Sequence, residues 1–154
     1  SPQLPDAQDL ILPSMILGQL GNDPQKPTIC FYGHVDLQPA KKEDGWNTDP
    51  YALTEINRNL YECGATDNKR PVLTWINRVE TFRVIKLVVN FRFVIEGMEE
   101  LGPLQLEKLL EEENQCFFCH VNYIVISDNL WLSNKKPALT YGSQGNACFF
   151  EEVK

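Results

Sequence analysis

A short apolar run followed by a glycine and a histidine constrains this chain most. The run Thr28-Ile29-Cys30-Phe31-Tyr32 is rich in β-branched and aromatic residues and is followed by Gly33, which predicts a buried strand closed by that glycine. His34 and Asp36 come next, at a strand end, where open α/β sheets place their chemistry. One ring nitrogen of His34 can bind a metal while Asp36 accepts the proton of the other nitrogen. The plainer alternative for this motif alone is a histidine that only hydrogen-bonds its neighbour.

Length and charge narrow the classes of partner. The chain has 154 residues, a length typical of one domain, and a hydrophobic content of 43%, enough for a packed core. Its 14 basic and 21 acidic residues give a net charge of -7, which argues against nucleic acid and an anionic membrane surface. The most apolar stretches, 10–17 and 87–95, are too short to cross a membrane and are interrupted by polar residues or proline. We therefore expect no nucleic-acid partner and no membrane partner.

Strand and helix patterns alternate along the chain. The first half of the chain predicts an edge strand over 10–20, the strand over 28–32, a hairpin of 51–56 and 60–62, and a helix from Pro71 to about 85. The second half predicts a strand over 87–96, a helix from Pro103, a buried strand over 121–127, and strands over 137–141 and 147–153. In the helix from Pro103, Leu104, Leu106, Leu109 and Leu110 are expected to point inward. This alternation predicts an α/β fold with a mainly parallel sheet flanked by helices.

Acidic and imidazole groups follow strand ends or precede helix starts. They are His34, Asp67, Glu99 with Glu100, and Asp128. Since the carboxyl ends of parallel strands share one edge of a sheet, these groups can converge there. A two-metal hydrolase needs such a set: a bridging carboxylate, further ligands on each ion, and one free carboxylate to move protons. Taken singly, Asp67 also fits a helix cap, Asp128 a turn residue, and the glutamates a surface acidic pair.

The five cysteines do not predict a disulfide framework. Cys30 and Cys148 lie in apolar runs and are predicted to be buried thiols. Cys116-Phe117-Phe118-Cys119-His120 matches the attachment pattern of c-type haem. The favoured alternative is a helix-to-strand junction that carries two thiols, because the motif follows an acidic helix and has no obvious sixth iron ligand.

Four segments of the sequence resemble carnosine dipeptidases, in a metallopeptidase family that also holds aminoacylases and di-zinc carboxypeptidases. They are 31–40 (FYGHVDLQPA), 64–69 (GATDNK), 95–100 (IEGMEE) and 123–131 (YIVISDNLW). The resemblance runs from about Leu10 to the C-terminus, and the serum form is the most similar. It implies that 1–154 is part of a zinc-exopeptidase-like catalytic domain, with the lid or dimerisation domain and the C-terminal catalytic part outside the chain.

The resemblance also implies a role for each candidate site residue. Zinc, two ions per site with manganese possible, would be held by His34, Asp67, Glu100 and Asp128, with Asp67 as the bridge. Glu99 would be the general base, and Asp36 would orient His34. The implied reaction is hydrolysis of small dipeptides such as Xaa-His (carnosine) by a water that bridges the two ions.

Departures from the family pattern leave an alternative. The family's final metal-binding histidine and the histidine from its lid would lie beyond Lys154, and Arg70 and Gln144 replace a family glycine and arginine. We therefore expect little activity from this chain alone, and a truncated, inactive member that binds metal or a partner is the alternative. The resemblance further implies homodimers and an extracellular location, with a cytoplasmic one as the alternative.

Overall fold

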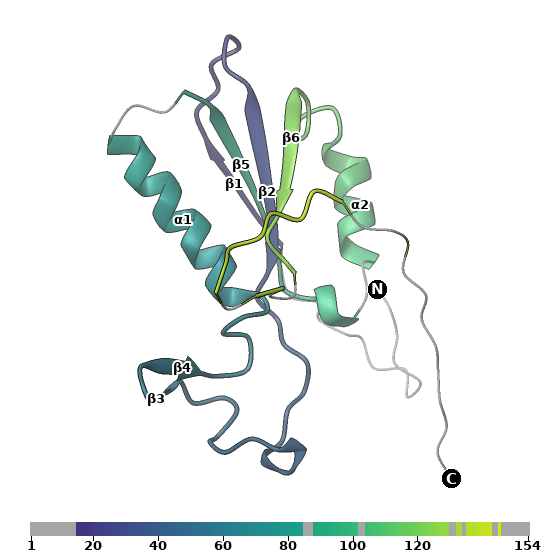
Figure 1. Ribbon diagram of the computed structural model, residues 1–154. Coiled ribbons are helices and arrows are strands. Elements are labelled where there is room, and N and C mark those ends of the chain that lie inside the picture. The colour runs from purple at the N-terminus through teal and green to yellow at the C-terminus, as the bar shows by residue number, and fades with distance from the viewer. Residues whose placement is uncertain are drawn as a thin grey trace, which may run out of the picture.

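A computed structural model of the chain describes residues 15–84, 88–101, 104–129, 132–133, 135–142 and 145. Within these ranges, a four-stranded sheet stands between two longer helices, and a small hairpin lies beyond one end of the sheet (Figure 1). Neither of the two described helices has the length and apolar character needed to cross a bilayer.

The sheet has the strand order β1-β5-β2-β6. The central strand β2 (Thr28–His34) runs parallel to β5 (Asn90–Glu96) on one side and to β6 (Val121–Ile126) on the other. The edge strand β1 (Ile16–Leu20) runs antiparallel to β5. The predicted α/β fold with a mainly parallel sheet is therefore confirmed, as is the edge position of the first strand; its predicted residues 10–14 lie outside the described residues.

The strand β2 is longer than its sequence predicts. Gly33 pairs with Ile95 and His34 with Glu96 in the parallel ladder, so the prediction that Gly33 closes the strand is wrong. A glycine fits inside this strand because a helix packs closely over it: a Cβ atom on Gly33 would lie 2.7 Å from Cγ2 of Val72. His34 is thereby held by strand hydrogen bonding rather than by a loop.

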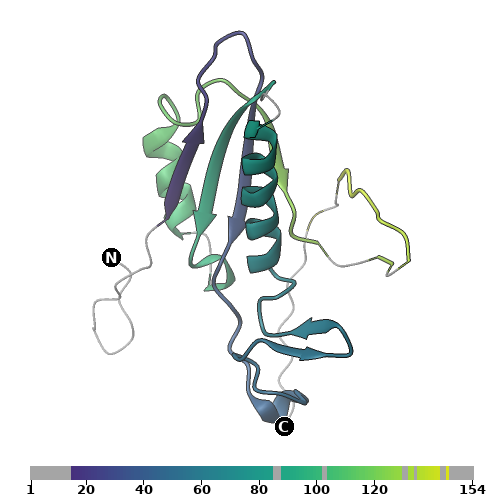
Figure 2. The ribbon, with the colours of Figure 1, turned by 90° about the vertical axis from the view of Figure 1, so that its left-hand side faces the viewer.

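The helix α1 (Lys69–Val84) covers the sheet face that carries Phe31 (Figure 2). The Phe31 ring centroid lies 5.3 Å from that of Trp75 on the helix and 5.8 Å from that of Phe93 on β5. Burial of these large apolar rings is the main stabilising contribution on this side of the sheet. The helix begins at Lys69, two residues before the predicted start, and the predicted end near 85 borders the undescribed residues 85–87.

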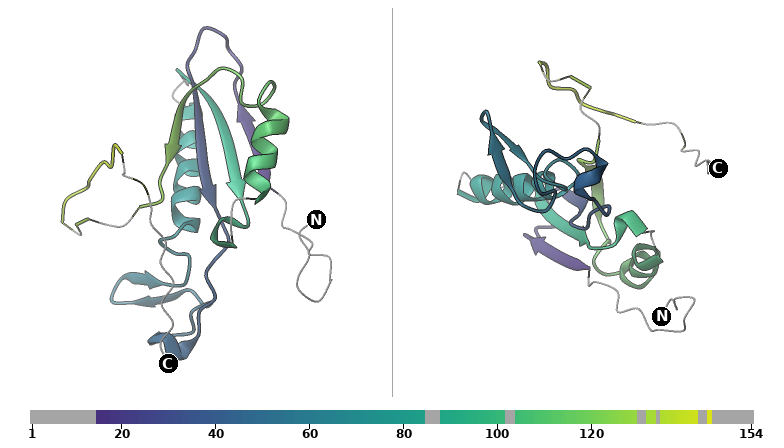
Figure 3. Two further views of the ribbon diagram at one scale, coloured as in Figure 1. Left: turned by 90° about the vertical axis from the view of Figure 1, so that its right-hand side faces the viewer. Right: turned by 90° about the horizontal axis from the view of Figure 1, so that it is seen from below.

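The helix α2 (Leu104–Glu113) lies on the opposite side of the sheet (Figure 3). Leu106 and Leu109 are half-buried, but Leu110 is 44% exposed, so the prediction that Leu110 points inward is wrong. One residue rotates an α-helix by about 100°, which carries Leu110 away from the stripe that Leu109 belongs to. The side chain of Leu104 lies outside the described part of the chain.

Arg92 is buried on the α2 side of the sheet. It is 6% exposed, donates to the carbonyl of Gly21 at 3.1 Å, and lies over the ring of Phe117 just after α2, 5.8 Å from its centroid. Cys30 on the same face is 3% exposed, as predicted; the other predicted buried thiol, Cys148, lies outside the described residues.

The predicted hairpin is confirmed. It consists of β3 (Thr54–Ile56) and β4 (Asn59–Tyr61), joined at Asn57 and Arg58, whose φ angles are 51° and 66°. Two successive positive φ values are typical of the two-residue type I′ turn. With the short helix η1 (Lys42–Asp44), the hairpin lies beyond the carboxyl ends of the parallel strands (Figure 1).

The strand predicted over 121–127 is confirmed as β6, but the prediction that it is buried is wrong. Tyr123, Ile124 and Ile126 are 62%, 69% and 54% exposed, and in the described part of the chain no strand pairs with the outer edge of β6. The prediction of a strand over 137–141 is also wrong: this segment forms no strand, and its Leu139 is 90% exposed. Apolar residues favour a strand only where a neighbour accepts and donates its backbone hydrogen bonds. The predicted strand over 147–153 lies outside the described residues.

Candidate metal centre

The candidate residues meet at the carboxyl edge of the parallel strands. His34 ends β2, Glu99 and Glu100 form part of the short helix η2 (Glu99–Leu101) just after β5, and Asp128 follows β6. Asp67 precedes the start of α1, which packs on the same sheet. Short connections at the ends of adjacent parallel strands therefore bring residues together that are up to 94 positions apart.

His34 is the centre of the cluster. Its side chain is 1% exposed, and its Nε2 atom lies 2.9 Å from Oδ1 of Asp67, 3.2 Å from Oδ2 of Asp128 and 4.0 Å from Oε2 of Glu99. The ligand atoms of His34, Asp67 and Asp128 all lie within 4.8 Å of one another, as do those of His34, Glu99 and Glu100. The histidine thus belongs to two groups of donors at once.

Asp36 connects the two halves of the cluster. Its Oδ1 lies 3.2 Å from Nδ1 of His34, and its Oδ2 accepts the backbone N–H of Glu100 at 3.0 Å. The side chain is only 16% exposed. One carboxylate thereby sets both the plane of the imidazole and the position of the chain segment that carries the two glutamates.

The electrostatics of the cluster reflect one imidazole among several carboxylates. Burial by itself would lower the pKa of His34, but the negative charge of Asp128, then of Glu99, Asp36 and Asp67, outweighs it and the pKa is raised. Partial burial raises the pKa of Asp67 and of Glu99, and the neighbouring carboxylates raise both further, against the opposing effect of His34. These groups therefore hold protons more tightly than ordinary side chains do.

Several supporting residues were not anticipated from the sequence. Gln38 donates from Nε2 to Oε2 of Glu100 at 2.8 Å. Asn68 is 1% exposed and donates to the carbonyl of Ser127 at 3.1 Å, which joins the segment of Asp67 to that of Asp128. Gln38 follows Asp36 in a polar loop, and nothing in its pattern indicates which way the loop returns to the site.

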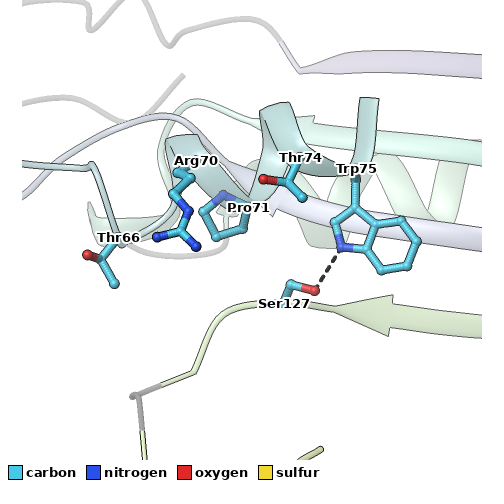
Figure 4. Close-up of a pocket in the computed structure, with 6 residues that line it drawn as sticks. All are labelled: Thr66, Arg70, Pro71, Thr74, Trp75 and Ser127. Atoms are coloured by element: carbon cyan, nitrogen blue, oxygen red, sulfur yellow. Dashed lines mark hydrogen bonds between the residues drawn. The ribbon is translucent and has the colours of Figure 1, made fainter. Parts of the chain in front are cut away.

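A pocket of about 200 Å³ adjoins the residues that precede two of the carboxylates (Figure 4). It is lined by Thr66, Arg70, Pro71, Thr74, Trp75 and Ser127. The indole nitrogen of Trp75 donates to Oγ of Ser127 at 2.8 Å, and this hydrogen bond links α1 to the residue that follows β6. This bond holds the segments that carry Asp67 and Asp128 at a fixed separation.

The carboxylate that pairs with His34 in the strand ladder is buried. Glu96 ends β5, is 1% exposed, and accepts a hydrogen bond from the hydroxyl of Tyr32 at 2.6 Å. Burial is the first cause that raises the pKa of Tyr32, and the hydrogen bond to Glu96 is the second. Sequence reasoning missed this pair, because an acidic residue at a strand end is most simply placed in solvent.

The donor set fits divalent metal ions. Ligand atoms around a tetrahedral zinc lie roughly 3.3 Å apart when the metal–ligand bonds are about 2.0 Å; the contacts of His34 Nε2 with Asp67 and Asp128 are 2.9 and 3.2 Å. Each ring nitrogen of His34 faces a carboxylate oxygen, that of Asp36 or that of Asp67. A cation bound among these carboxylates would offset their negative charge.

Comparisons with known proteins agree with this chemistry. The model of the peptidase family M20/M25/M40 matches residues 30–132. A Beta-Ala-His dipeptidase of Rattus norvegicus is 62% identical over 156 residues, covering 100% of this chain and 32% of the relative. A Cys-Gly metallodipeptidase of Schizosaccharomyces pombe is 46% identical over 148 residues, covering 94% of this chain and 31% of the relative.

The fold agrees as well. The crystal structure of human carnosine dipeptidase 1 matches with a TM-score of 0.78 at 60% identity, over 86% of this chain and 28% of that one. The chain thus spans about a third of the length of the curated relatives it matches.

Proposed function

Because the chain belongs to the peptidase family M20/M25/M40, we propose that it forms part of a metal-dependent dipeptidase. The single observation that carries this proposal is the meeting of His34, Asp67, Glu99, Glu100 and Asp128 at one edge of the sheet. The two curated relatives described above are dipeptidases, so they give no support to the alternative of an inactive metal binder.

The metal ions proposed are two zinc ions, with manganese as the alternative metal. His34, Asp67 and Asp128 would hold one ion, and Glu100 together with Asp67 would hold the other. Bound zinc lowers the pKa of a coordinated water to ~7 and so supplies hydroxide near neutral pH. Asp36 keeps the imidazole in the orientation and tautomer that a ligand needs.

Glu99 is the group that moves the proton. Its carboxylate lies within 4.0 Å of His34 Nε2 and has a raised pKa, chiefly through partial burial. A general base of this kind takes the proton from the attacking water and gives it to the leaving amine, so that one carboxylate serves both halves of the peptide hydrolysis. The raised pKa makes the Glu99 carboxylate a stronger base for the first half of the reaction.

The substrates proposed are small dipeptides, with Xaa-His such as β-alanyl-histidine first. The support is the identity of 62% to a Beta-Ala-His dipeptidase against 46% to a Cys-Gly metallodipeptidase. Comparison of kcat/KM for β-alanyl-histidine and cysteinyl-glycine decides between these substrates. A higher kcat/KM for cysteinyl-glycine would contradict the proposed substrate, but it would still agree with dipeptidase activity.

The catalytic assignment is tested by Glu99→Gln in the whole protein with zinc present. We expect hydrolysis of β-alanyl-histidine to fall by roughly 10²–10⁴-fold, the usual contribution of a positioned acid–base group. Zinc binding, measured by calorimetry, should be kept. The matched control is Glu107→Gln, the same change at an exposed position of α2, which should leave turnover unchanged. Equal turnover in the two variants would contradict the role of Glu99.

We further propose that this chain is part of a longer catalytic domain, and that the whole protein is an extracellular homodimer. The exposed apolar residues of β6 and the coverage of about a third of the relatives support the first statement. Intact mass and light scattering of the protein from its natural source test size and assembly, and its recovery from the medium or from cells tests location.

With the chain alone, which has only His34 and His120 as imidazoles, we expect little turnover.

A further inference from the structure

The turn between α2 and β6 carries two thiols that the dipeptidase chemistry does not use. Cys116 and Cys119 stand between the end of α2 at Glu113 and the start of β6 at Val121. The strand β6 leads from this turn to the metal centre, a length of roughly 20 Å for six residues. The thiols are therefore too far from the clustered carboxylates to be ligands there.

The turn holds the two cysteines close together. The Sγ atom of Cys119 lies 2.7 Å from the carbonyl oxygen of Cys116; with standard bond lengths this places the sulfur at most about 5.5 Å from the Cα atom of Cys116. Cys116 is exposed, so its own side chain can rotate toward that sulfur. A disulfide needs Cα atoms ~4.4–6.8 Å apart; two cysteines three positions apart in one turn, with the sulfur of one against the carbonyl of the other, can meet this condition.

Other contacts hold the turn in place. The backbone N–H groups of Cys116 and Phe118 both donate to the carbonyl of Glu113, at 3.1 Å each. The rings of Phe117 and Phe118 pack edge to face, and Phe117 receives the guanidinium of the buried Arg92. These contacts use backbone groups and the side chains of the two residues between the cysteines, and neither thiol takes part in them, so the sulfurs can join without loss of the packing of the turn on the sheet.

We propose that Cys116 and Cys119 form a reversible intrachain disulfide by exchange with a small-molecule disulfide such as oxidised glutathione. The thiolate of the exposed Cys116 attacks the reagent, forms a mixed disulfide and releases one glutathione thiol. The sulfur of Cys119 then attacks the sulfur of Cys116 and releases the second glutathione thiol. The two protein thiols are oxidised, one glutathione disulfide is reduced, and the two thiol protons pass to the released thiolates.

The other described cysteines offer no such pair. Cys30 is 3% exposed inside the sheet, and Cys63 lies in the loop between the hairpin and α1, where its thiol faces the carbonyl of Gln38. These two residues serve as internal controls, since Cys30 should react only after unfolding and Cys63 should react singly.

The test is equilibration of the full chain with reduced and oxidised glutathione, followed by alkylation, digestion and mass spectrometry. We expect the peptide with both cysteines to lose the mass of two hydrogens, and C119S to stop at a glutathione adduct on Cys116. A wild-type chain that also stops at this adduct, stays fully reduced, or carries covalently attached haem would overturn the proposal.

The contribution of the fold is measured by repeating the equilibration in denaturant. Any Cys-x-x-Cys segment forms the disulfide to some extent. The proposal therefore requires the equilibrium constant for disulfide formation to be at least tenfold larger in the folded chain than in the unfolded chain, a difference in reduction potential of about 30 mV. Equal closure in both states would show that the turn does not preorganise the pair, and would also overturn the proposal.

Discussion

At the scale of single residues, Asp36 is the position where both carboxylate oxygens are needed, because each oxygen has a different partner. Oδ1 faces Nδ1 of His34 and Oδ2 accepts the backbone N–H of Glu100. In Asp36→Asn one oxygen becomes an NH₂ group, so one contact changes from acceptor to donor and is lost. We expect zinc affinity, measured by calorimetry, to fall by about 10–100-fold, the usual effect of removing such an orienting partner.

Asp49→Asn is the matched control for that change. Asp49 accepts the backbone N–H of Tyr51 through Oδ1 at 2.9 Å, and an asparagine oxygen can accept the same bond. Its zinc affinity should equal that of the unchanged chain. Equal affinities of the Asp36 and Asp49 variants would show that orientation of His34 does not matter for binding.

The raised pKa values predict opposite responses to pH with and without metal. In the metal-free chain His34, Asp67 and Glu99 all have pKa values above their ordinary 6.5, 3.8 and 4.5. The folded state therefore binds more protons than the unfolded state, and this contribution to stability is lost as pH rises through the raised values. Zinc must displace the same protons, so its binding and the stability it adds grow with pH.

Thermal unfolding between pH 5 and 7 measures both trends. With a chelator present, we expect the contribution of the three groups to lower the unfolding midpoint as pH rises; His34→Gln should flatten this slope. The increase of the midpoint caused by zinc should become larger over the same range. An increase caused by zinc that is independent of pH would contradict the idea that ligands and proton carriers are the same side chains.

At the scale of secondary-structure elements, the contact of α1 with β2 depends on Gly33. A Cβ atom there would lie 2.7 Å from Val72 and 3.1 Å from the Phe31 ring. Gly33→Ala should therefore force the helix away from the strand and destabilise the chain by about 1–3 kcal/mol, as overpacked cores do. Gly18→Ala in β1 is the control: its nearest neighbour would be Phe93 at 3.4 Å, so its free energy of unfolding should change by less than about 0.5 kcal/mol.

Denaturant unfolding of both variants measures this difference. If Gly33→Ala is as stable as Gly18→Ala, the helix adjusts its position without cost. In that case His34, the residue after Gly33, should also move, and the zinc affinity of Gly33→Ala should fall.

The elements that the sequence predicts well are those whose signal is local. Asn57 and Arg58 form the hairpin turn, and the period of two along β5 places Phe91 and Phe93 on the face covered by α1. The meeting of His34 with distant carboxylates also follows from the order of parallel strands. Gln38 and Glu96 could not be anticipated, because their contacts depend on the path of a loop and on burial supplied by other elements.

At the scale of the whole molecule, the outer edge of β6 is the feature with the largest consequence. Tyr123, Ile124 and Ile126 are 62%, 69% and 54% exposed, and in the described residues no strand pairs with this edge. Unpaired strand edges with apolar side chains promote association between chains. The net charge of -7 opposes that association, so it should depend strongly on salt.

Ile124→Lys tests this behaviour in the chain alone. A charge in the middle of the edge strand should reduce concentration-dependent association, measured by light scattering at moderate salt, and leave the unfolding midpoint nearly unchanged because the side chain is already exposed. Leu73→Lys is the control, since Leu73 is 59% exposed on α1 and not on a strand edge. If both variants reduce association equally, the cause is the smaller net negative charge or general surface hydrophobicity, and β6 is not the contact.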